Sequence, residues 1–552
     1  MSASETRNKT REKSLPTFHN DPEDFLPEAL GGLIAAHPDA VWNEAGFISR
    51  RSPTNERVAV ISGGGSGHEP LHAGFIGAGM LDAAVPGHMF TSPNAIQITE
   101  ATRYANGGAG VVQVVKNYTG DVLNFRVSRQ ALTGEVETRQ VLVDDDVATE
   151  DEDGPGRRGT GATILVEKIC GAAAARGHSL ERVTDMGNWV AHHSRSMAVA
   201  LAPGHLPTAA RPTFDLPEGE MEIGVGIHGE RGTGRSEAGS AREMVEEMLD
   251  RILPSLELNT GEEVVCVVNG LGGTTLLELN LIFRELLEQL EGRKVKVMRS
   301  LVGNFVTAVN MSGVSITISR TTPELTELYD DPTEAPAWPK LGRPQSHAPA
   351  RIRHEETLPE GEENNWLSGF LSRVQGAIDD LSELDRKAGD GDFGANMSAA
   401  LGDLELPLRG SNAEVLEFLS QRFLIRAGGT SGAILGTIFR ELAAAEDLAE
   451  GLSQALEAVT ELGGAQVGDR TLVDALSPAA ERAAEVGGGD VEKLLSSCFE
   501  AAAEGARGTA ELDAKRGRAA YVGEAAKGVV DPGSIVIAWL FGGSGELSEF
   551  NA

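Results

Sequence analysis

In the first part of the chain, short segments with the apolar pattern of strands alternate with segments whose apolar residues recur at helical spacing. Short apolar runs at 58–62 and 109–115 indicate strands, 136–143 indicates another strand, and helical spacing at 21–38 precedes the first of them. Each run leads directly into glycines or polar side chains. Strands that alternate with helices predict an α/β domain, in which ligands bind beyond the carboxyl ends of the strands.

A second α/β stretch begins near Met221. The run that starts there predicts a short strand that delivers His228 to its end, and 264–268 has the composition of a buried strand. Two further candidate strands lie at 295–298 and 314–319. The N-terminal part is therefore expected to contain two α/β subdomains.

The composition changes at about residue 322. Residues 322–365 are rich in Pro and charge without a sustained period, which indicates a linker. Beyond it the spacing is helical, because 366–381 carry one apolar face and Ser411 forms a capping box with Glu414. Further helical segments are expected at about 415–424, 440–460, 473–486, 490–506 and 535–541. These segments predict an all-α bundle or barrel of roughly seven or eight helices.

The predicted fold is multidomain, with an N-terminal α/β part of two subdomains and a C-terminal all-α part. The expected parts are a disordered arm at 1–20, an α/β domain at 21–321 with subdomains of about 21–210 and 211–321, a linker at 322–365, and an all-α domain at 366–552.

Net charge, cysteine spacing and the lengths of the apolar runs limit which classes of function and location are expected. A formal net charge of −34 argues against nonspecific binding to nucleic acid or anionic membranes, so anionic ligands would need metal, backbone N–H groups or a few placed cations. The 3 cysteines stand in no metal-binding spacing and are expected to be reduced core residues. No run approaches the roughly 18 apolar residues of a membrane span, and the polar start lacks a secretory apolar region. We therefore expect a cytoplasmic protein.

Three carboxylates cluster in the C-terminal part, at Asp385, Asp390 and Asp392. Mg²⁺ accepts a few carboxylate oxygens and keeps its other positions for water or substrate phosphates, so the cluster suits a nucleotide held through metal. An EF-hand is excluded because glycines occupy positions where that loop needs ligands. The alternative is an Asp- and Gly-rich turn between two helices with no metal.

Two glycine-rich stretches are candidate ligand loops. The first, GGGSGHEP at 63–70, follows a strand and contains His68, but it has neither the GxGxxG register nor a Walker ending. The second, at 428–432, would offer backbone N–H groups to phosphate at a helix start, or would simply permit close helix packing. His68 and His228 could each be an ordinary hydrogen-bonded histidine, and Asp121 could be a helix cap.

Taken together and in order, the motifs closely resemble those of the single-chain, ATP-dependent dihydroxyacetone kinases, from about residue 20 onward. The motifs that carry the resemblance are GGGSGHEP at 63–70, FTSP at 90–93, KNYTGD at 116–121, DDDVA at 144–148, GVGIHGE at 224–230, GDGD at 389–392, GGTSG at 428–432, GDRTLVD at 468–474, KRGRAAY at 515–521 and DPG at 531–533. One departure is Phe393, a position that varies within the family.

The resemblance implies a chemistry for the α/β part. The ketone of the substrate would be held as a covalent hemiaminal on His228, which selects short keto sugars over glycerol because an imidazole nitrogen adds to a carbonyl. His68 and Asp121 would lie near the reacting hydroxyl, where one takes or relays its proton and the other positions the substrate. The substrate-binding positions would be Gly65, Ser66, Lys116 and Asp121.

The resemblance also implies that ATP binds the helical domain, with Mg²⁺ on Asp385, Asp390 and Asp392. The nucleotide-binding positions would be Gly429, Thr430, Ser431, Gly432, Arg518, Asp531 and Gly533. A homodimer and a place in glycerol metabolism are expected from the same resemblance. The reaction expected first is phosphorylation of dihydroxyacetone, with erythrulose as the alternative substrate. Cyclisation of FAD and a non-enzymatic regulatory role are the other classes considered.

Overall fold

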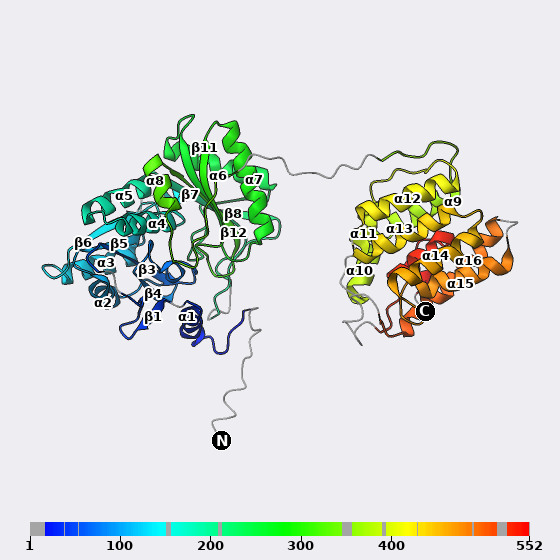
Figure 1. Cartoon of the computed structure of the whole chain (residues 1–552), viewed down its shortest axis with the longest axis horizontal. Helices are drawn as coiled ribbons and strands as arrows, with labels where there is room; N and C mark the ends of the chain where they lie inside the picture. The colour runs from blue at the N-terminus through cyan, green and yellow to red at the C-terminus, as the bar shows by residue number, and fades with distance from the viewer. Residues whose placement is uncertain are drawn as a thin grey trace, which may run out of the picture. The chain divides into compact units, whose positions relative to one another are not determined.

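The computed structural model describes residues 17–37, 39–52, 55–150, 156–207, 212–344, 356–388, 393–427, 429–487, 491–515 and 527–550. The chain divides into two compact units, Met1–His347 and Ala348–Ala552 (Figure 1). The first unit is α/β with two sheets and the second is helical, which confirms the predicted fold class.

The first sheet has six strands in the order β1-β2-β4-β3-β5-β6. Its strands are β1 (Ala40–Asn43), β2 (Phe47–Arg50), β3 (Ala59–Ser66), β4 (Ala83–Met89), β5 (Val111–Lys116) and β6 (Thr138–Val143). The four strands β3 to β6 run parallel, and β1 and β2 form an antiparallel edge. The carboxyl ends of the parallel strands therefore meet at one edge of the sheet, where ligand sites form in such folds.

The central strands of this sheet are buried on both faces because apolar residues occupy both sets of alternating positions. Ala59 and Ile61 pack with the helices α2 (Ala95–Ala105) and α3 (Thr119–Ala131), whereas Val60 packs with the helices of the opposite face. That opposite face is covered by α4 (Ala162–Ala175) and α5 (Leu180–His192). The helix α1 (Phe25–Ala36) precedes the sheet.

The second sheet has the order β11-β10-β12-β7-β8-β9 and is mostly antiparallel. Its strands are β7 (Ser194–Ala202), β8 (Glu220–Ile223), β9 (Gly234–Glu237), β10 (Glu263–Gly270), β11 (Lys296–Gly303) and β12 (Ser312–Arg320). The helices α6 (Ala241–Leu256) and α7 (Leu276–Gly292) pack on one face through Val264 and Cys266 (Figure 1). Val265 and Val267 face the other way, into the core that contains α4, so this core joins the two sheets.

The segment predicted as a linker at 322–365 begins with ordered structure. The helix α8 (Pro323–Asp330) buries Leu328 and Tyr329 in the core of the first unit, and Lys168 Nζ donates to Leu328 O at 3.0 Å. Trp338 is also buried in that core. The helix α8 is short, and its few apolar residues stand among Pro and acidic residues. The composition of this segment therefore did not indicate a helix.

The second unit contains nine α-helices among its described residues. They are α9 (Asn365–Gly376), α10 (Ile378–Ala388), α11 (Phe393–Leu401), α12 (Asn412–Arg426), α13 (Gly429–Ala444), α14 (Leu448–Gly463), α15 (Val473–Val486), α16 (Val491–Gly508) and α17 (Pro532–Phe541). Every residue of α17 is buried, as expected for a central helix that is apolar all round. The predicted capping box of Ser411 and Glu414 is present at the start of α12. The apolar pattern at 366–381 spans parts of two helices, since α9 ends before Ala377.

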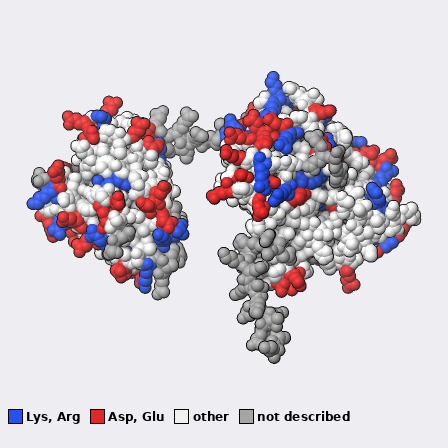
Figure 2. Space-filling model, turned by 180° about the vertical axis from the view of Figure 1, so that it is seen from behind, with Lys and Arg blue, Asp and Glu red and all other residues white. Residues whose placement is uncertain are grey.

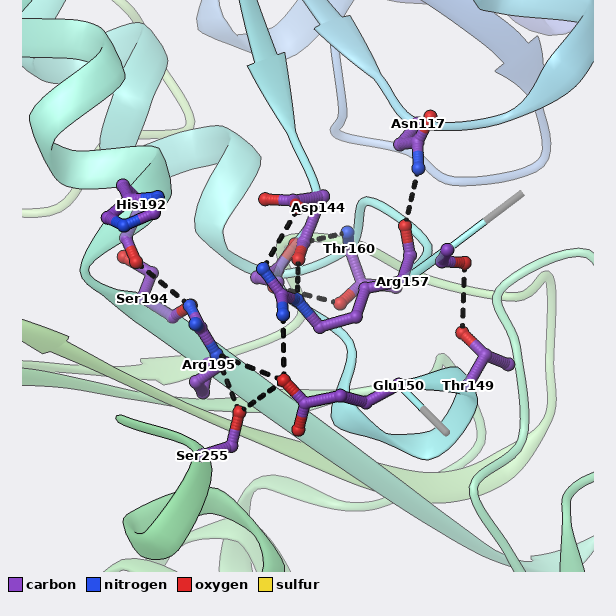
Figure 3. Close-up of polar contacts among 12 residues, drawn as sticks. Asn117, Asp144, Thr149, Glu150, Arg157, Thr160, His192, Ser194, Arg195 and Ser255 are labelled. Atoms are coloured by element: carbon purple, nitrogen blue, oxygen red, sulfur yellow. Dashed lines mark hydrogen bonds and ion pairs between the residues drawn. The ribbon is translucent and has the colours of Figure 1, made fainter. Parts of the chain in front are cut away.

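A polar network holds the segment that follows β6 (Figure 3). Asp144 pairs with Arg157 at 2.9 Å, and Arg157 also pairs with Glu150 at 2.7 Å. Asn117 Nδ2 donates to Arg157 O at 2.7 Å, so the network extends to the residue before Tyr118. Asp144 is therefore held by an ion pair in this network.

Candidate active site

The first unit gathers the predicted chemical residues from both of its sheets. His68 follows β3, Lys116 ends β5, and Asp121 lies in the first turn of α3. His228 comes from the loop between β8 and β9 in the second sheet. The imidazole rings of His68 and His228 lie 4.7 Å apart between centroids, and Lys116 Nζ lies 3.6 Å from Asp121 Oδ2.

His68 is fully buried and held by one backbone contact. Its Nδ1 lies 2.8 Å from Thr307 O, a pure acceptor, so Nδ1 carries the proton and Nε2 presents a lone pair. Nε2 is buried and has no hydrogen-bond partner among the residues that the structure describes. Burial lowers the pKa of His68 well below its usual value, assisted by the nearby His228 and Lys116. The ring is therefore a neutral base with an open acceptor nitrogen.

His228 lies among aromatic rings. Its centroid is 4.4 Å from that of Tyr118 and 5.7 Å from that of Phe90, both in edge-on geometry. Burial lowers the pKa of His228, and the carboxylate of Glu230 opposes that change. The imidazole is thereby kept neutral at pH 7, the form in which its nitrogen can act as a nucleophile.

The loop that carries His228 is fixed by two charged residues. Glu230 Oε2 accepts from the backbone N–H of His228 at 2.9 Å. Arg158 donates to Glu230 at 3.3 Å and to Gly224 O at 2.8 Å, and it also pairs with Asp146. The loop is thus bound to the segment after β6, which orients the ring of His228.

The glycine-rich segment owes its composition to close packing. A Cβ at Gly64 would lie 2.1 Å from Lys116 Nζ, and one at Gly65 would lie 2.6 Å from Thr91 N. Ser66 Oγ donates to Gly87 O at 2.8 Å, so its hydroxyl proton is already engaged. The predicted substrate positions Gly65 and Ser66 belong to β3 itself, and what they offer an incoming ligand is mainly backbone.

Sequence reasoning missed two buried polar residues behind this site. His72 Nε2 lies 2.8 Å from Lys116 Nζ, and His72 Nδ1 lies 2.6 Å from Glu167 Oε1. Burial lowers the pKa of His72 well below its usual value and raises the pKa of Glu167 to about 8. The available signal was the pair Glu167 and Lys168 within the apolar run of α4, where a buried carboxyl group needs a partner.

In the second unit only part of the predicted metal cluster can be placed. Asp385 lies in the last turn of α10, and its Oδ2 accepts from Phe393 N at 2.9 Å. Asp390 and Asp392 lie outside the described residues. No group of three His, Cys, Asp or Glu able to hold a metal occurs among the positions that are described. The contact between Asp385 and Phe393 brings together the residues that flank the other two aspartates.

The predicted nucleotide residues lie at two helix starts. Thr430, Ser431 and Gly432 form the first turn of α13, together with Gly429. Asp531 caps α17, where its Oδ2 accepts from Ser534 N at 2.7 Å, and burial raises its pKa to about 6. The predicted residues at this second start are Asp531 and Gly533, and Arg518 lies outside the described residues.

Comparison with known proteins decides the family. A Dak1 domain matches residues 31–337 and a DAK2 domain matches residues 387–545. The triokinase/FMN cyclase of Rattus norvegicus is 36% identical over 560 residues, covering 95% of this chain and 97% of that protein. The chain belongs to the dihydroxyacetone kinase family. The family resemblance expected from the motifs is therefore confirmed.

Two further members show how wide the similarity is within the dihydroxyacetone kinase family. The L-erythrulose 1-kinase of Mycolicibacterium smegmatis is 34% identical over 563 residues, covering 96% of this chain and 98% of that protein. A crystal structure of the dihydroxyacetone kinase from C. freundii in complex with AMP-PNP and Mg²⁺ matches with a TM-score of 0.64 and 31% identity, covering 95% of this chain and 98% of that one. Like them, this member has both parts in one chain.

Surface and hydropathy add two observations. On the faces drawn in Figure 2, Lys and Arg side chains lie among Asp and Glu side chains, and much of the lower part of the first unit's face carries neither. Among the described helices, none is long and apolar enough to cross a bilayer.

Proposed function

We propose that this member of the dihydroxyacetone kinase family transfers the γ-phosphoryl group of ATP to a hydroxyl of a short ketose, and that dihydroxyacetone is its first substrate. The observation that carries the proposal is the pairing of two neutral histidines, His228 and His68, beside Asp121 at the strand ends. This arrangement supplies a nucleophilic nitrogen, an open acceptor nitrogen and a carboxylate within one small volume.

The chemistry has two parts. First, a nitrogen of His228 adds to the substrate carbonyl, so that a C–N bond forms as the C=O π bond breaks. The other ring nitrogen loses its N–H proton and the carbonyl oxygen gains one, which gives a neutral hemiaminal. Second, the free hydroxyl attacks the γ-phosphorus, and its proton passes to Asp121, with His68 placed to relay it or to position the substrate. Covalent attachment rejects glycerol because glycerol has no carbonyl group.

The helical unit supplies the nucleotide. Three aspartates, Asp385, Asp390 and Asp392, form an all-oxygen donor set that fits Mg²⁺. The ion would neutralise charge on the triphosphate during transfer. The first turn of α13, from Gly429 to Gly432, would offer backbone N–H groups to phosphate, and Arg518, Asp531 and Gly533 complete the proposed nucleotide contacts. The C. freundii relative crystallised with AMP-PNP and Mg²⁺ supports this assignment.

Two further activities follow from the names of relatives. An L-erythrulose 1-kinase at 34% identity makes erythrulose a second candidate substrate, since both ketoses present the same hydroxyketone end to His228. The triokinase/FMN cyclases make flavin cyclisation a candidate second reaction at the nucleotide site. A purely regulatory role is disfavoured because His68, Asp121 and His228 are all present and gathered.

The test is ATP-dependent phosphorylation by the purified full chain, measured as kcat/KM at fixed Mg²⁺. The substrates are dihydroxyacetone, glyceraldehyde, D-erythrulose, L-erythrulose and glycerol. We expect dihydroxyacetone to lead and glycerol to be inert. Preference for one erythrulose would reassign the substrate, and inactivity with every ketose would refute the proposal and direct attention to FAD as substrate. A homodimer, a cytoplasmic location and a role in glycerol metabolism remain part of the proposal.

A further inference from the structure

Behind the candidate site a line of four polar side chains runs away from the substrate region into the core. It consists of Asp121, Lys116, His72 and Glu167, all of them buried. The gaps between their polar atoms are 3.6 Å from Asp121 to Lys116, 2.8 Å from Lys116 to His72, and 2.6 Å from His72 to Glu167. The line ends at Glu167 Oε2, which has no hydrogen-bond partner within the described part of the chain.

The contacts of His72 with Lys116 and with Glu167 are short enough to be hydrogen bonds, and they limit how protons can be arranged along the line. Each hydrogen bond contains one proton between its heavy atoms, so a neutral His72 can be arranged in two ways. In the first, Lys116 is charged and donates to Nε2, while Nδ1–H donates to a Glu167 carboxylate. In the second, Nε2–H donates to a neutral Lys116, while a protonated Glu167 donates to Nδ1. The two states contain the same number of protons.

Shifting one proton along each hydrogen bond converts the first state into the second. The shift removes both charges from the core, and burial favours the neutral forms of buried groups. The raised pKa of Glu167 and the lowered pKa of His72 are in the directions that make the second state accessible. Glu167 is fully buried, so no solvent competes for its proton.

Building on the proposed kinase function, we propose that His72 and Glu167 form an internal proton relay that accepts, through Lys116, the proton released by the substrate hydroxyl. As the new O–P bond forms, the substrate O–H bond breaks and its proton moves to Asp121. Lys116 gives a proton to His72 Nε2, and His72 gives its Nδ1 proton to Glu167. Neutral Lys116 then takes the proton from Asp121, once the two groups have closed to hydrogen-bond distance. After product leaves, Lys116 returns this proton to Asp121, which releases it to solvent. Lys116 is then neutral, and the reverse shift along the two hydrogen bonds restores the first state.

The relay gives His72 and Glu167 a role that is separate from substrate capture. Neither residue needs to touch the ketose, so both are positioning residues that act through Lys116 and Asp121. Their replacement should slow phosphoryl transfer and leave the covalent addition at His228 unchanged. A purely structural role would instead weaken both steps together.

The test uses the full chain with Glu167→Gln and His72→Gln. In Glu167→Gln, the amide oxygen can still accept a hydrogen bond but cannot take up a proton. In His72→Gln, the amide can accept from Lys116 and donate to Glu167 but cannot pass a proton between them. We expect the single-turnover rate of phosphoryl transfer to fall by about tenfold or more in both variants. The mass of the ketose adduct in native mass spectrometry and the KM for ketose should be unchanged.

The matched control is Glu285→Gln, which alters a buried carboxyl of α7 that pairs with Arg242 and Arg284. It should keep the wild-type transfer rate. An unchanged rate in Glu167→Gln would overturn the relay, and so would loss of the adduct in step with the rate. If the wild-type protein forms no ketose phosphate at all, the kinase proposal itself fails. If the wild type and Glu167→Gln are equally active, only the relay fails.

Discussion

The rings of His68 and His228 lie in contact, with centroids 4.7 Å apart, although the two residues follow strands of different sheets. Their juxtaposition depends on the core around α4 that joins the sheets, and on the bond from His68 Nδ1 to Thr307 O. Burial lowers the pKa of His68, and the neighbouring His228 lowers it further because two adjacent imidazolium charges would repel. One neutral histidine can therefore bind the ketone while the other stays available as a proton acceptor.

Replacing His228 by alanine should remove covalent capture. We expect kcat/KM for dihydroxyacetone to fall by about 100-fold or more, since the substrate loses both its attachment and its orientation. The ketose adduct should disappear from the native mass spectrum. His178→Ala, a change outside the site in the same unit, should keep both signals. A His228→Ala variant with wild-type KM and rate would contradict the covalent role.

The pH dependence of capture should respond to Glu230. Burial holds the pKa of His228 below its usual 6.5, and Glu230 raises it against that effect. Only the neutral imidazole is nucleophilic, so kcat/KM should fall on the acid side, below pH 6.5. Glu230→Gln removes the charge that favours the imidazolium, and the acid limb should then move to lower pH. The profile of Glu237→Gln, a change at an exposed carboxylate of β9, should match wild type, and an upward move in Glu230→Gln would refute this account.

A side chain at Gly64 should disable Lys116. The Cβ of Gly64→Ala would lie 2.1 Å from Lys116 Nζ and 3.2 Å from His72 Nε2, so the ammonium group must move. Displacement by about 1 Å at a reacting centre can cost about 100-fold in rate, and we expect a loss of that order in kcat. Gly31→Ala is the control, because a Cβ there meets nothing within 4 Å. Wild-type kcat in Gly64→Ala would show that the position of Lys116 is unimportant.

If Asp390 binds the metal, its replacement should impair ATP turnover and leave ketose capture intact. Asp390→Ala should lose Mg²⁺-dependent ATP turnover by about 100-fold or more, because a ligand to the ion on the triphosphate is removed. The α/β unit should still form the ketose adduct, measured by native mass spectrometry. Asp380→Ala, at an exposed carboxylate in the first turn of α10, should behave as wild type. Unaltered turnover in Asp390→Ala would refute the assignment.

Among the strands that sequence analysis found, those with continuous apolar character gave the strongest signal, whereas β6 was found although polar residues interrupt its apolar ones. Runs such as 109–115 and 264–268 correspond to β5 and β10, which are buried on both faces and therefore leave a strong signal. β4 was missed because it contains Pro and Gly, and β7 because it mixes Ser and Ala with few large apolar residues. Tertiary burial decides these strands, since their own residues have weak strand preference.

The sequence by itself determined the order of the two parts, the family, and which motifs stand at strand and helix ends, because apolar spacing and turn residues act over short distances along the chain. Only the tertiary structure decided that His228 meets His68, and that Lys116 reaches His72 and Glu167. Those contacts join residues that are remote in sequence, and no local pattern records them. The buried pair of His72 and Glu167 acquires its altered pKa values from the surrounding core, which exists only after the chain has folded.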